Sequence, residues 1–316
     1  MSKFFKQTQR ANEDHSQGIS RSLDAAPRSI ENLLESINET VDEQASGLRT
    51  SPSDSKVEPV LDAAQNGQSV ACEVVEFPTE PYGQMHISRS GERILFPELA
   101  TNSAPEMEAY RKLRTRVLRL QASRGFRTVV ISSAAKGEGK TLTSTNLGLF
   151  CAQLPEYRVL LVDGDLRTRG LSRLLGGPDT PGLAEVLAGD VRPEAAVLAT
   201  DVPNLYVMGP GRPSISPSEL LTGTSWKDFI AWAGEQFKLV LVDAPPVFAT
   251  ADFELISAGC DGILLVVRAR VTTRVMLQTL MRQIDSSKLL GVTLNSVNGF
   301  DHTQSYYYSH YETKEN

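Results

Sequence analysis

The chain has 316 residues, of which 41% are hydrophobic and 22% charged, so it is long enough for one or two domains with a sizeable core. Its formal net charge of −6 argues against a general nucleic-acid-binding protein, which would normally carry an excess of Lys and Arg. Cys72, Cys151 and Cys260 are far apart and lack CxxC spacing, so the sequence predicts neither a disulfide framework nor a zinc site. No apolar stretch reaches the roughly 18 residues that a membrane span needs, so we expect any membrane association to come from a partner.

The first 104 residues lack the apolar composition of a folded domain. Up to about Gln68 the chain is rich in Ser, Glu, Asp, Gln and Asn and poor in aromatic residues, so it cannot bury enough apolar surface to offset the entropy lost on ordering. We expect residues 1–104 to be largely disordered, with a short helix over 29–41 as one exception. Short structured pieces are also expected within 70–99, where the runs Val74-Val75 and Ile94-Leu95-Phe96 would add a strand or dock on the core.

A folded domain is predicted from residue 105 to residue 298. It opens with a charged, periodic stretch, Glu106–Leu120, that predicts a helix, and a second helix is expected over Thr141–Leu154. Short apolar runs predict strands at Thr128–Ser132, Arg158–Val162, Leu205–Met208, Leu239–Val242, Gly262–Val267 and Leu290–Asn295. Continuous apolar strands that alternate with helical stretches indicate a doubly wound, mostly parallel α/β sheet with both faces covered.

The first of these strands runs into a glycine-rich loop and then a helix, which is the context that a phosphate-binding P-loop requires. Its glycines let backbone N–H groups surround phosphate oxygens beside a helix N-terminus. Lys140, which we expect to lie in a solvated loop, can reach the β- and γ-phosphates of ATP, and the Thr141 hydroxyl can bind Mg²⁺. The loop reads Ala134-Ala135-Lys136-Gly137-Glu138-Gly139-Lys140-Thr141, with alanine in place of the first glycine of GxxxxGK[ST].

Two later strands end in carboxylates. Asp163 and Asp165 stand in the segment Asp163-Gly164-Asp165-Leu166-Arg167, and Asp243 comes before Ala244-Pro245-Pro246. Because ligands of parallel sheets sit at the carboxyl ends of strands, we expect these acids beside the loop. In the first pair, one acid would hold Mg²⁺ while the other accepts a proton from an incoming hydroxyl, and the sequence does not choose between them. The candidate metal ligands are Thr141, Asp163 and Asp243, and the candidate catalytic residues are Lys140, Asp163 and Asp165.

Together the three motifs resemble those of the bacterial tyrosine kinases of capsular and extracellular polysaccharide synthesis, a family of the P-loop fold shared with the MinD/ParA ATPases. The family has a Walker A loop, an acidic DxDxR motif, which is the most specific of the three, and a DxxP Walker B motif. Here they stand at Ala134–Thr141, Asp163–Arg167 and Asp243–Pro246. The resemblance covers roughly residue 106 to the C-terminus and implies a cytoplasmic autokinase that uses ATP and Mg²⁺ to phosphorylate tyrosine.

The resemblance also implies roles for further residues. Glu108, Arg111 and Arg114 form the ExxRxxR motif that contributes in the family to the contact between subunits of a homo-oligomeric ring, and Pro217–Leu221 is similar to the family as well. In related P-loop folds an asparagine near the position of Asn295 reads the adenine, with turn capping as the alternative here. The candidate nucleotide-binding residues are then Ala135, Lys136, Gly137, Glu138, Gly139, Lys140, Thr141, Leu142 and Asn295.

Partners are implied by the resemblance as well. They are a transmembrane polysaccharide co-polymerase, which would activate the kinase at the inner face of the cell membrane, and a tyrosine phosphatase. The last residues, 299–316, contain the cluster Tyr306, Tyr307, Tyr308 and Tyr311 among polar neighbours, which is unlike a core strand. We expect a flexible tail whose tyrosines are autophosphorylation sites. An aromatic adhesive tail is the alternative.

Two other functions stay open for this sequence. A MinD/ParA-like ATPase would act as a positional switch, but Ala135 stands where those proteins carry a signature lysine, and Lys136 comes one residue too late. A non-catalytic ATP-sensing module would dock on a membrane polysaccharide co-polymerase, but the intact acidic motifs argue against it. Incubation with MgATP followed by detection of phosphotyrosine separates all three functions.

Overall fold

The described part of the chain comprises residues 82–88, 94–96, 105–178, 181–213 and 215–296 of a computed structural model. All of these residues belong to a single unit, Val75–Asn316. The helix expected over 29–41, the run Val74-Val75 and the tyrosine-rich tail lie outside the described residues. None of the described helices is both long enough and apolar enough to cross a lipid bilayer.

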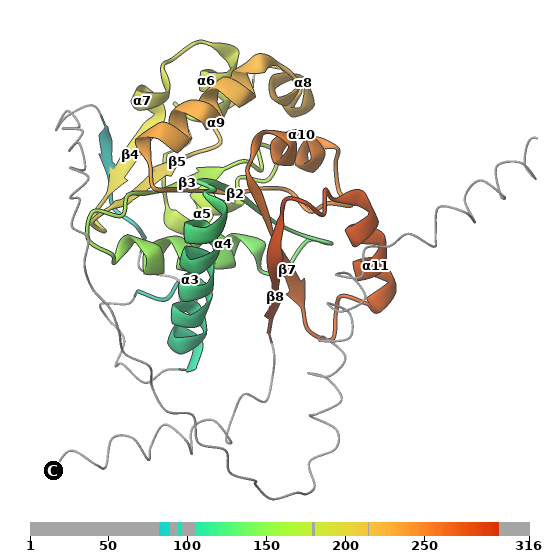
Figure 1. The fold of residues 1–316 in the computed structure, drawn as a ribbon. Helices are drawn as coiled ribbons and strands as arrows, with labels where there is room; N and C mark the ends of the chain where they lie inside the picture. Colours follow the sequence, from blue (N-terminus) through green and yellow to red (C-terminus); the bar gives the residue numbers. More distant parts are fainter. Residues whose placement is uncertain (1–81, 89–93, 97–104, 179–180, 214, 297–316) are drawn as a thin grey trace, which may run out of the picture. The chain divides into compact units, whose positions relative to one another are not determined.

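A sheet of eight strands runs through the described residues (Figure 1). Its order is β1-β4-β5-β3-β6-β2-β7-β8. Every neighbouring pair is parallel except β4 and β5, so the doubly wound, mostly parallel fold predicted from the sequence is confirmed. The strands are β1 (Gly83–Met85), β2 (Thr128–Ser133), β3 (Val159–Asp163), β4 (Val197–Thr200), β5 (Leu205–Met208), β6 (Leu239–Asp243), β7 (Gly262–Arg268) and β8 (Leu289–Asn295).

The central strands are apolar along most of their length because helices cover both faces of the sheet. Every residue of β2, β3 and β6 is buried, and each of these strands lies within one residue of its predicted bounds. The strands β1 and β4 were not predicted, because each is short and buries only one residue, so neither shows the continuous apolar run of the central strands. β4 and β5 form an antiparallel hairpin whose turn contains Asn204 at a φ of 64°, a left-handed conformation that asparagine tolerates.

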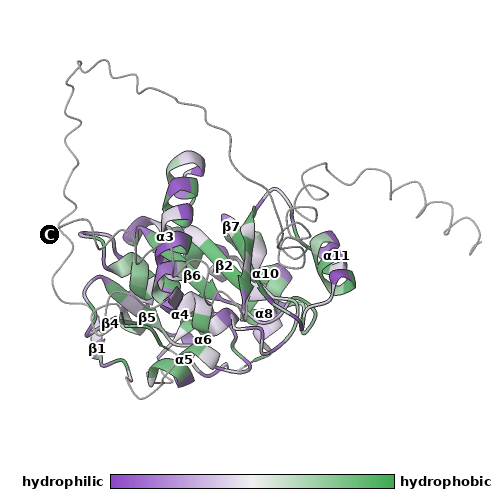
Figure 2. Cartoon of the chain, turned by 90° about the horizontal axis from the view of Figure 1, so that it is seen from below, coloured by the Kyte–Doolittle hydropathy of each residue, from purple (hydrophilic) through white to green (hydrophobic). Residues whose placement is uncertain are grey.

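The helices cover the two faces according to the direction of each crossover. α4 contacts β2, β3, β5, β6 and β7 and carries α3 on its outer side, whereas the crossovers through α9 and α10 run in the opposite direction along the sheet and therefore cover the other face (Figure 1). α3 buries only Met107 and Val117, and its surface is largely hydrophilic (Figure 2). The helices are α3 (Pro105–Arg124), α4 (Lys140–Ala152), α5 (Gly170–Leu175), α6 (Leu183–Ala188), α7 (Pro193–Ala196), α8 (Pro217–Thr222), α9 (Thr224–Gln236), α10 (Asp252–Gly259) and α11 (Arg274–Gln283).

The core extends upstream of residue 105, where the sequence places the start of the domain. β1 pairs in parallel with β4, and the side chains of Ile87, Ile94 and Phe96 belong to the same hydrophobic cluster as the central strands. The backbone N–H of Leu95 donates a hydrogen bond of 3.0 Å to the Asn146 side chain in α4. The apolar run Ile94-Leu95-Phe96 therefore docks on the core.

Asp261, which precedes β7, anchors the start of β2. Its Oδ2 accepts hydrogen bonds from the backbone N–H groups of Arg127 and Thr128, both at 2.9 Å, and from the Thr128 hydroxyl at 2.8 Å. Asp261→Ala should lower the free energy of unfolding by about 2 kcal/mol, because it removes a charged acceptor shared by three donors. Asp261→Asn keeps an oxygen and should cost less. Urea unfolding checks this, and an alanine variant as stable as the wild type would contradict it.

Candidate active site

The P-loop joins β2 to α4 at the carboxyl end of the central strands. Gly137 and Gly139 adopt φ angles of 85° and 98°, which residues with a side chain rarely adopt, and Gly139 is the N-cap of α4. Ala134, at the position of the first glycine of the motif, is fully buried, and its carbonyl accepts a hydrogen bond from the Phe248 N–H at 3.4 Å. The fold therefore accommodates alanine at this position.

Lys140 is buried, which corrects our expectation that it lies in a solvated loop. It is the first residue of α4 and only 8% exposed. Its Nζ lies 3.4 Å from Asp165 Oδ2 and 3.6 Å from Asp243 Oδ2, and 3.4 Å from the Thr141 hydroxyl. A buried ammonium is costly unless acids pair with it. The first turn of α4 brings Lys140 against Asp243 at the end of β6 and Asp165 just after β3, so its burial depends on tertiary contacts that the local sequence does not reveal.

Asp243 ends β6 and links the metal-binding candidates to α4. Its Oδ2 accepts a hydrogen bond of 2.7 Å from the Thr141 hydroxyl, and its Oδ1 lies 3.4 Å from the Ser144 hydroxyl. Burial raises the pKa of Asp243, and the Lys140 ammonium and Thr141 hydroxyl offset part of that rise. The structure thus brings Thr141 and Asp243 together as predicted. Ser144 was missed, although its spacing of three from Thr141 places both on one helix face.

Asp163 ends β3 directly beside Asp243 in the neighbouring strand. Its Oδ2 accepts a hydrogen bond of 3.0 Å from the backbone N–H of Ser172 in α5, whereas its buried Oδ1 has no hydrogen-bond partner within the described part of the chain. Burial, and then the negative charge of Asp243, raise the pKa of Asp163 to about 7. Near neutral pH this carboxyl group is therefore poised to take up or release a proton.

Asp165 and Arg167 of the DxDxR motif face different neighbours. Asp165 pairs with Lys140, and its Oδ1 accepts a hydrogen bond of 3.0 Å from the Thr168 N–H. Arg167 instead donates from Nε to Asp252 Oδ2 at 2.7 Å and from its terminal nitrogen to the Ser218 hydroxyl at 3.2 Å. Asp252 was missed in the sequence because no motif contains it. Ser218 lies in the segment Pro217–Leu221, for which the sequence suggested a resemblance to the family but no role.

Residues from β7, from the loop that follows it and from β8 form hydrogen bonds with the P-loop. The Asn295 side chain donates a hydrogen bond of 2.9 Å to the Glu138 carbonyl, Arg268 donates to the Gly137 carbonyl at 3.1 Å, and the Thr272 hydroxyl donates to the buried Glu138 carboxylate. The Asn295 Oδ1 also accepts from the N–H of the next residue at 2.8 Å, as a turn-capping residue would. Asn295 therefore lies against the loop, and its contact with adenine stays a prediction.

Among the remaining predicted residues, Ala135 donates its backbone N–H to the Glu138 carboxylate at 3.2 Å. Lys136 is exposed, and Ala135 and Leu142 are half-buried. On α3, Arg111 forms an ion pair with Glu108 at 3.5 Å, and Arg114 donates to the carbonyl of residue 150 near the end of α4 at 3.0 Å. The subunit contact proposed for these three residues stays a prediction, and the tail tyrosines lie outside the described residues.

The oxygen atoms and the open backbone at this site suit a magnesium–nucleotide complex. Among the described residues, apart from Gly137 and its two chain neighbours, no atom lies within 4 Å of the place where a side chain at Gly137 would begin, so this side of the loop has room for phosphate oxygens. The Thr141 hydroxyl, the Asp243 carboxylate and the unpartnered oxygen of Asp163 are the hard ligands that Mg²⁺ prefers. Within the described residues, no group of three or more His, Cys, Asp or Glu could hold a metal ion, so phosphates and water would have to complete its shell.

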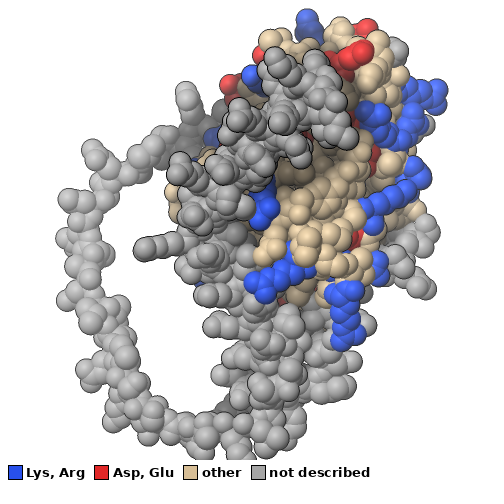
Figure 3. All heavy atoms as spheres, turned by 90° about the vertical axis from the view of Figure 1, so that its right-hand side faces the viewer, with Lys and Arg blue, Asp and Glu red and all other residues tan. Residues whose placement is uncertain are grey.

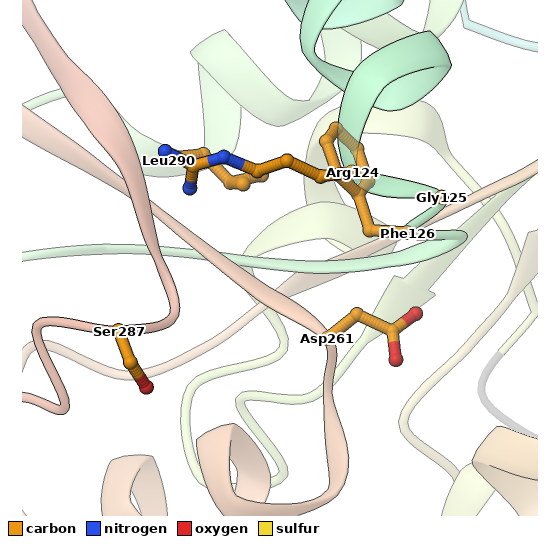
Figure 4. A pocket seen from close by; sticks show the side chains of 6 residues that line it. All are labelled: Arg124, Gly125, Phe126, Asp261, Ser287 and Leu290. Atoms are coloured by element: carbon orange, nitrogen blue, oxygen red, sulfur yellow. The ribbon is translucent and has the colours of Figure 1, made fainter.

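A pocket of about 310 Å³ lies at the opposite end of the strands from the P-loop (Figure 4). It is lined by residues that precede β2 and β7 or surround the start of β8, which are the amino ends of parallel strands. Because ligands of parallel α/β sheets bind at the carboxyl ends, this pocket is not the candidate active site. The lining residues are Arg124, Gly125, Phe126, Asp261, Ser287 and Leu290.

Known proteins that resemble this chain are bacterial tyrosine kinases. Tyrosine-protein kinase YwqD of Bacillus subtilis (strain 168) is 32% identical over 211 residues, which cover 66% of this chain and 87% of YwqD. Tyrosine-protein kinase ptk of Acinetobacter johnsonii is 30% identical over 224 residues, which cover 70% of this chain but only 30% of ptk. The kinase domain of Escherichia coli tyrosine kinase ETK superimposes with a TM-score of 0.56 and 29% identity over 60% of this chain and 75% of that domain. No family model matches the chain.

The raised pKa of Asp163 predicts a pH-dependent stability in the absence of nucleotide. The folded state retains a proton that the unfolded chain, with an ordinary carboxyl pKa of about 4, releases, so stability falls as pH rises from about 4 to about 7. The fall should approach about 1.4 kcal/mol per pH unit, and Asp163→Asn, which cannot titrate, should flatten it. Urea unfolding of both proteins across this range tests the prediction. Parallel curves would show that Asp163 does not bind the proton.

Proposed function

Because the chain belongs to the bacterial tyrosine-protein kinase family, we propose that it transfers the γ-phosphate of MgATP to tyrosine hydroxyls, including those of its own tail. We place this activity in the regulation of capsular or extracellular polysaccharide synthesis and export. The observation that carries the proposal is the buried cluster of Lys140, Asp165 and Asp243, with Asp163 beside it. One cation and three carboxylates at the end of a P-loop supply both phosphate binding and the acids that a phosphoryl transfer to a hydroxyl needs.

The bound magnesium–nucleotide would supply the phosphoryl group and an electrophilic phosphorus. The chain's own residues would bind and orient it: backbone N–H groups of residues 136–141 would surround phosphate oxygens, and Lys140 would balance their negative charge. Thr141 and Asp243, already joined by a hydrogen bond, would hold the metal ion, directly and through water. Phosphate oxygens would compete with Asp165 and Asp243 for the Lys140 ammonium, because it contacts both carboxylates in this structure.

The two acids of the DxDxR motif suit different tasks. Asp163 has an oxygen without a hydrogen-bond partner in the described residues and a pKa near 7, so it can accept the proton of an incoming tyrosine hydroxyl. Asp165 is held by Lys140 and Thr168, which suits a fixed acid that orients the reacting groups. We therefore favour Asp163 as the proton acceptor, which leaves Thr141 and Asp243 to hold the metal ion.

A surface on the α11 side suits a protein partner. Val271 and Val275 are 53% and 70% exposed, and exposed arginines at 270, 274 and 282 lie in the same segment. Lys and Arg side chains gather around uncharged surface on this face (Figure 3). An apolar area with a cationic rim supports our proposal of a transmembrane activator with a cytoplasmic segment, which would hold the kinase at the inner membrane face. We further propose a homo-oligomeric ring through α3 and reversal by a tyrosine phosphatase.

Lys140→Met should abolish autophosphorylation, because it removes the cation that binds the transferred phosphate. Purified protein is incubated with MgATP and probed for phosphotyrosine, and the rate should fall by at least about 100-fold. Lys227→Met on α9 is the control, since this lysine is exposed and has no proposed role in the site, and its variant should keep the wild-type activity. Wild-type protein that releases ADP without phosphotyrosine would contradict kinase function, as would binding of ATP without any turnover.

The tail prediction uses substitutions that keep the aromatic rings. Replacing the tyrosines at 306, 307, 308 and 311 by Phe should remove most phosphotyrosine while leaving nucleotide affinity unchanged, because only the acceptor hydroxyls are lost. Tyr110→Phe on α3 serves as the control and should label like the wild type. Mass spectrometry of the labelled wild type identifies the modified residues. Full labelling of the quadruple variant would place the acceptors elsewhere.

A further inference from the structure

Arginine beside a phosphoryl-transfer site often stabilises the charge of the transferred group. In this structure the Arg167 guanidinium is committed elsewhere. Its Nε donates to Asp252 Oδ2 at 2.7 Å, and its terminal nitrogen lies 3.3 Å from Asp252 Oδ1 and 3.2 Å from the Ser218 hydroxyl. Paired contacts of this kind fix the plane of a guanidinium far better than a single ion pair does. The arginine of the DxDxR motif is therefore fixed on Asp252 and Ser218.

Asp252 is built to receive this arginine. It is the first residue of α10, only 2% exposed, and accepts a third hydrogen bond of 2.7 Å from Ser218 at the start of α8. Burial by itself would raise the pKa of Asp252, but the hydrogen bonds from Arg167 and Ser218 bring it below its ordinary value. The group is thus a charged carboxylate at neutral pH, held between two helices.

The segment that Arg167 belongs to is a tight turn that carries Asp165. The Asp165 carbonyl accepts hydrogen bonds from the N–H groups of Thr168 at 3.2 Å and Arg169 at 3.0 Å, and the Asp165 side chain accepts from Thr168 as well. Arg169 adopts a φ of 53°, which a residue with a side chain holds only when its surroundings impose it. A fixed Arg167 therefore fixes the turn, and the turn fixes the carboxylate of Asp165.

We propose that Asp252 is a positioning residue for phosphoryl transfer: through Arg167 it holds the turn that places the Asp165 carboxylate against the Lys140 ammonium. Asp252 lies on the segment that follows Asp243 in the chain. The Arg167–Asp252 pair therefore also connects the DxDxR turn to the Walker B strand. The same connection is supported by the Gly164 N–H, which donates to the Asp243 carbonyl at 2.9 Å. The inference rests on the proposed function and extends it to a residue outside the three motifs.

A positioning role and a merely structural ion pair predict different kinetics. A misplaced acid slows the chemical step while nucleotide still binds to the P-loop, so kcat falls and the KM for ATP stays. A structural defect lowers the amount of folded protein or weakens nucleotide binding instead. Asp252→Asn keeps the size of the side chain and removes the charge. Arg167→Lys keeps the charge and removes the paired geometry.

The experiment measures ADP release and phosphotyrosine together for the full chain at several MgATP concentrations. Asp252→Asn and Arg167→Lys should each lower kcat by about 10- to 100-fold and leave the KM for ATP within about twofold. The double variant should be no slower than the slower single variant, because both substitutions break one connection. Glu254→Gln is the control: this acid stands in the same first turn of α10 but is exposed, and its kcat should match the wild type.

Other outcomes overturn the inference. A kcat near the wild-type value in both single variants, additive losses in the double variant, or a loss confined to ATP affinity would each exclude positioning of Asp165. Measuring ADP separates this result from the proposed function. A wild type that releases ADP without phosphotyrosine contradicts the kinase assignment, while the ratio of ADP release between variant and wild type still tests the role of Asp252. A wild type with neither product contradicts both.

Discussion

The arrangement of the site depends on the ammonium group of Lys140. Among the described residues, it is the only lysine that forms ion pairs with the buried carboxylates at the carboxyl ends of the strands. Asp165 and Asp243 lie within 3.4 and 3.6 Å of its Nζ, and Asp163 stands in the strand next to Asp243. Burial, and after it the negative charge of the neighbouring carboxylates, raise the pKa of Asp163 and that of Asp243 even with Lys140 present. Phosphate binding acts on this same balance of charge.

The order of strands produces the cluster. β2 lies between β6 and β7, and β3 is the next strand beyond β6, so the loop after β2 and the acids that end β3 and β6 meet at one edge. Parallel pairing sets Asp163 level with Asp243, and Asp243 level with Ile131 of β2. The hydrophobic strands thus do more than fill the core. Their register determines which polar side chains share the carboxyl edge.

Contacts from outside the motifs then hold the loops in place. On one side, Asn295 donates a hydrogen bond to the carbonyl of Glu138 in the P-loop, and Thr272 donates one to the Glu138 carboxylate. On the other side, Asp252 accepts a hydrogen bond from Arg167 of the DxDxR turn. A site that must place a phosphoryl group, a metal ion and a hydroxyl within a fraction of an ångström needs such support, because a misplacement of about 1 Å can cost about 100-fold in rate. A partner that contacts the α11 side would lie close to the hydrogen bond between Thr272 and Glu138.

The sequence by itself determined the fold class, the central strands, the P-loop and the acids at the ends of β3 and β6. These follow from local patterns: apolar runs, glycines before a helix, and carboxylates at strand ends. Only the tertiary structure decided that Lys140 is buried, that Arg167 pairs with Asp252, and that Asn295 binds Glu138. The last two pairs are separated by 85 and 157 residues, so no local pattern records them. They form because the parallel sheet brings distant strand ends to one edge, where burial makes each polar group require a partner.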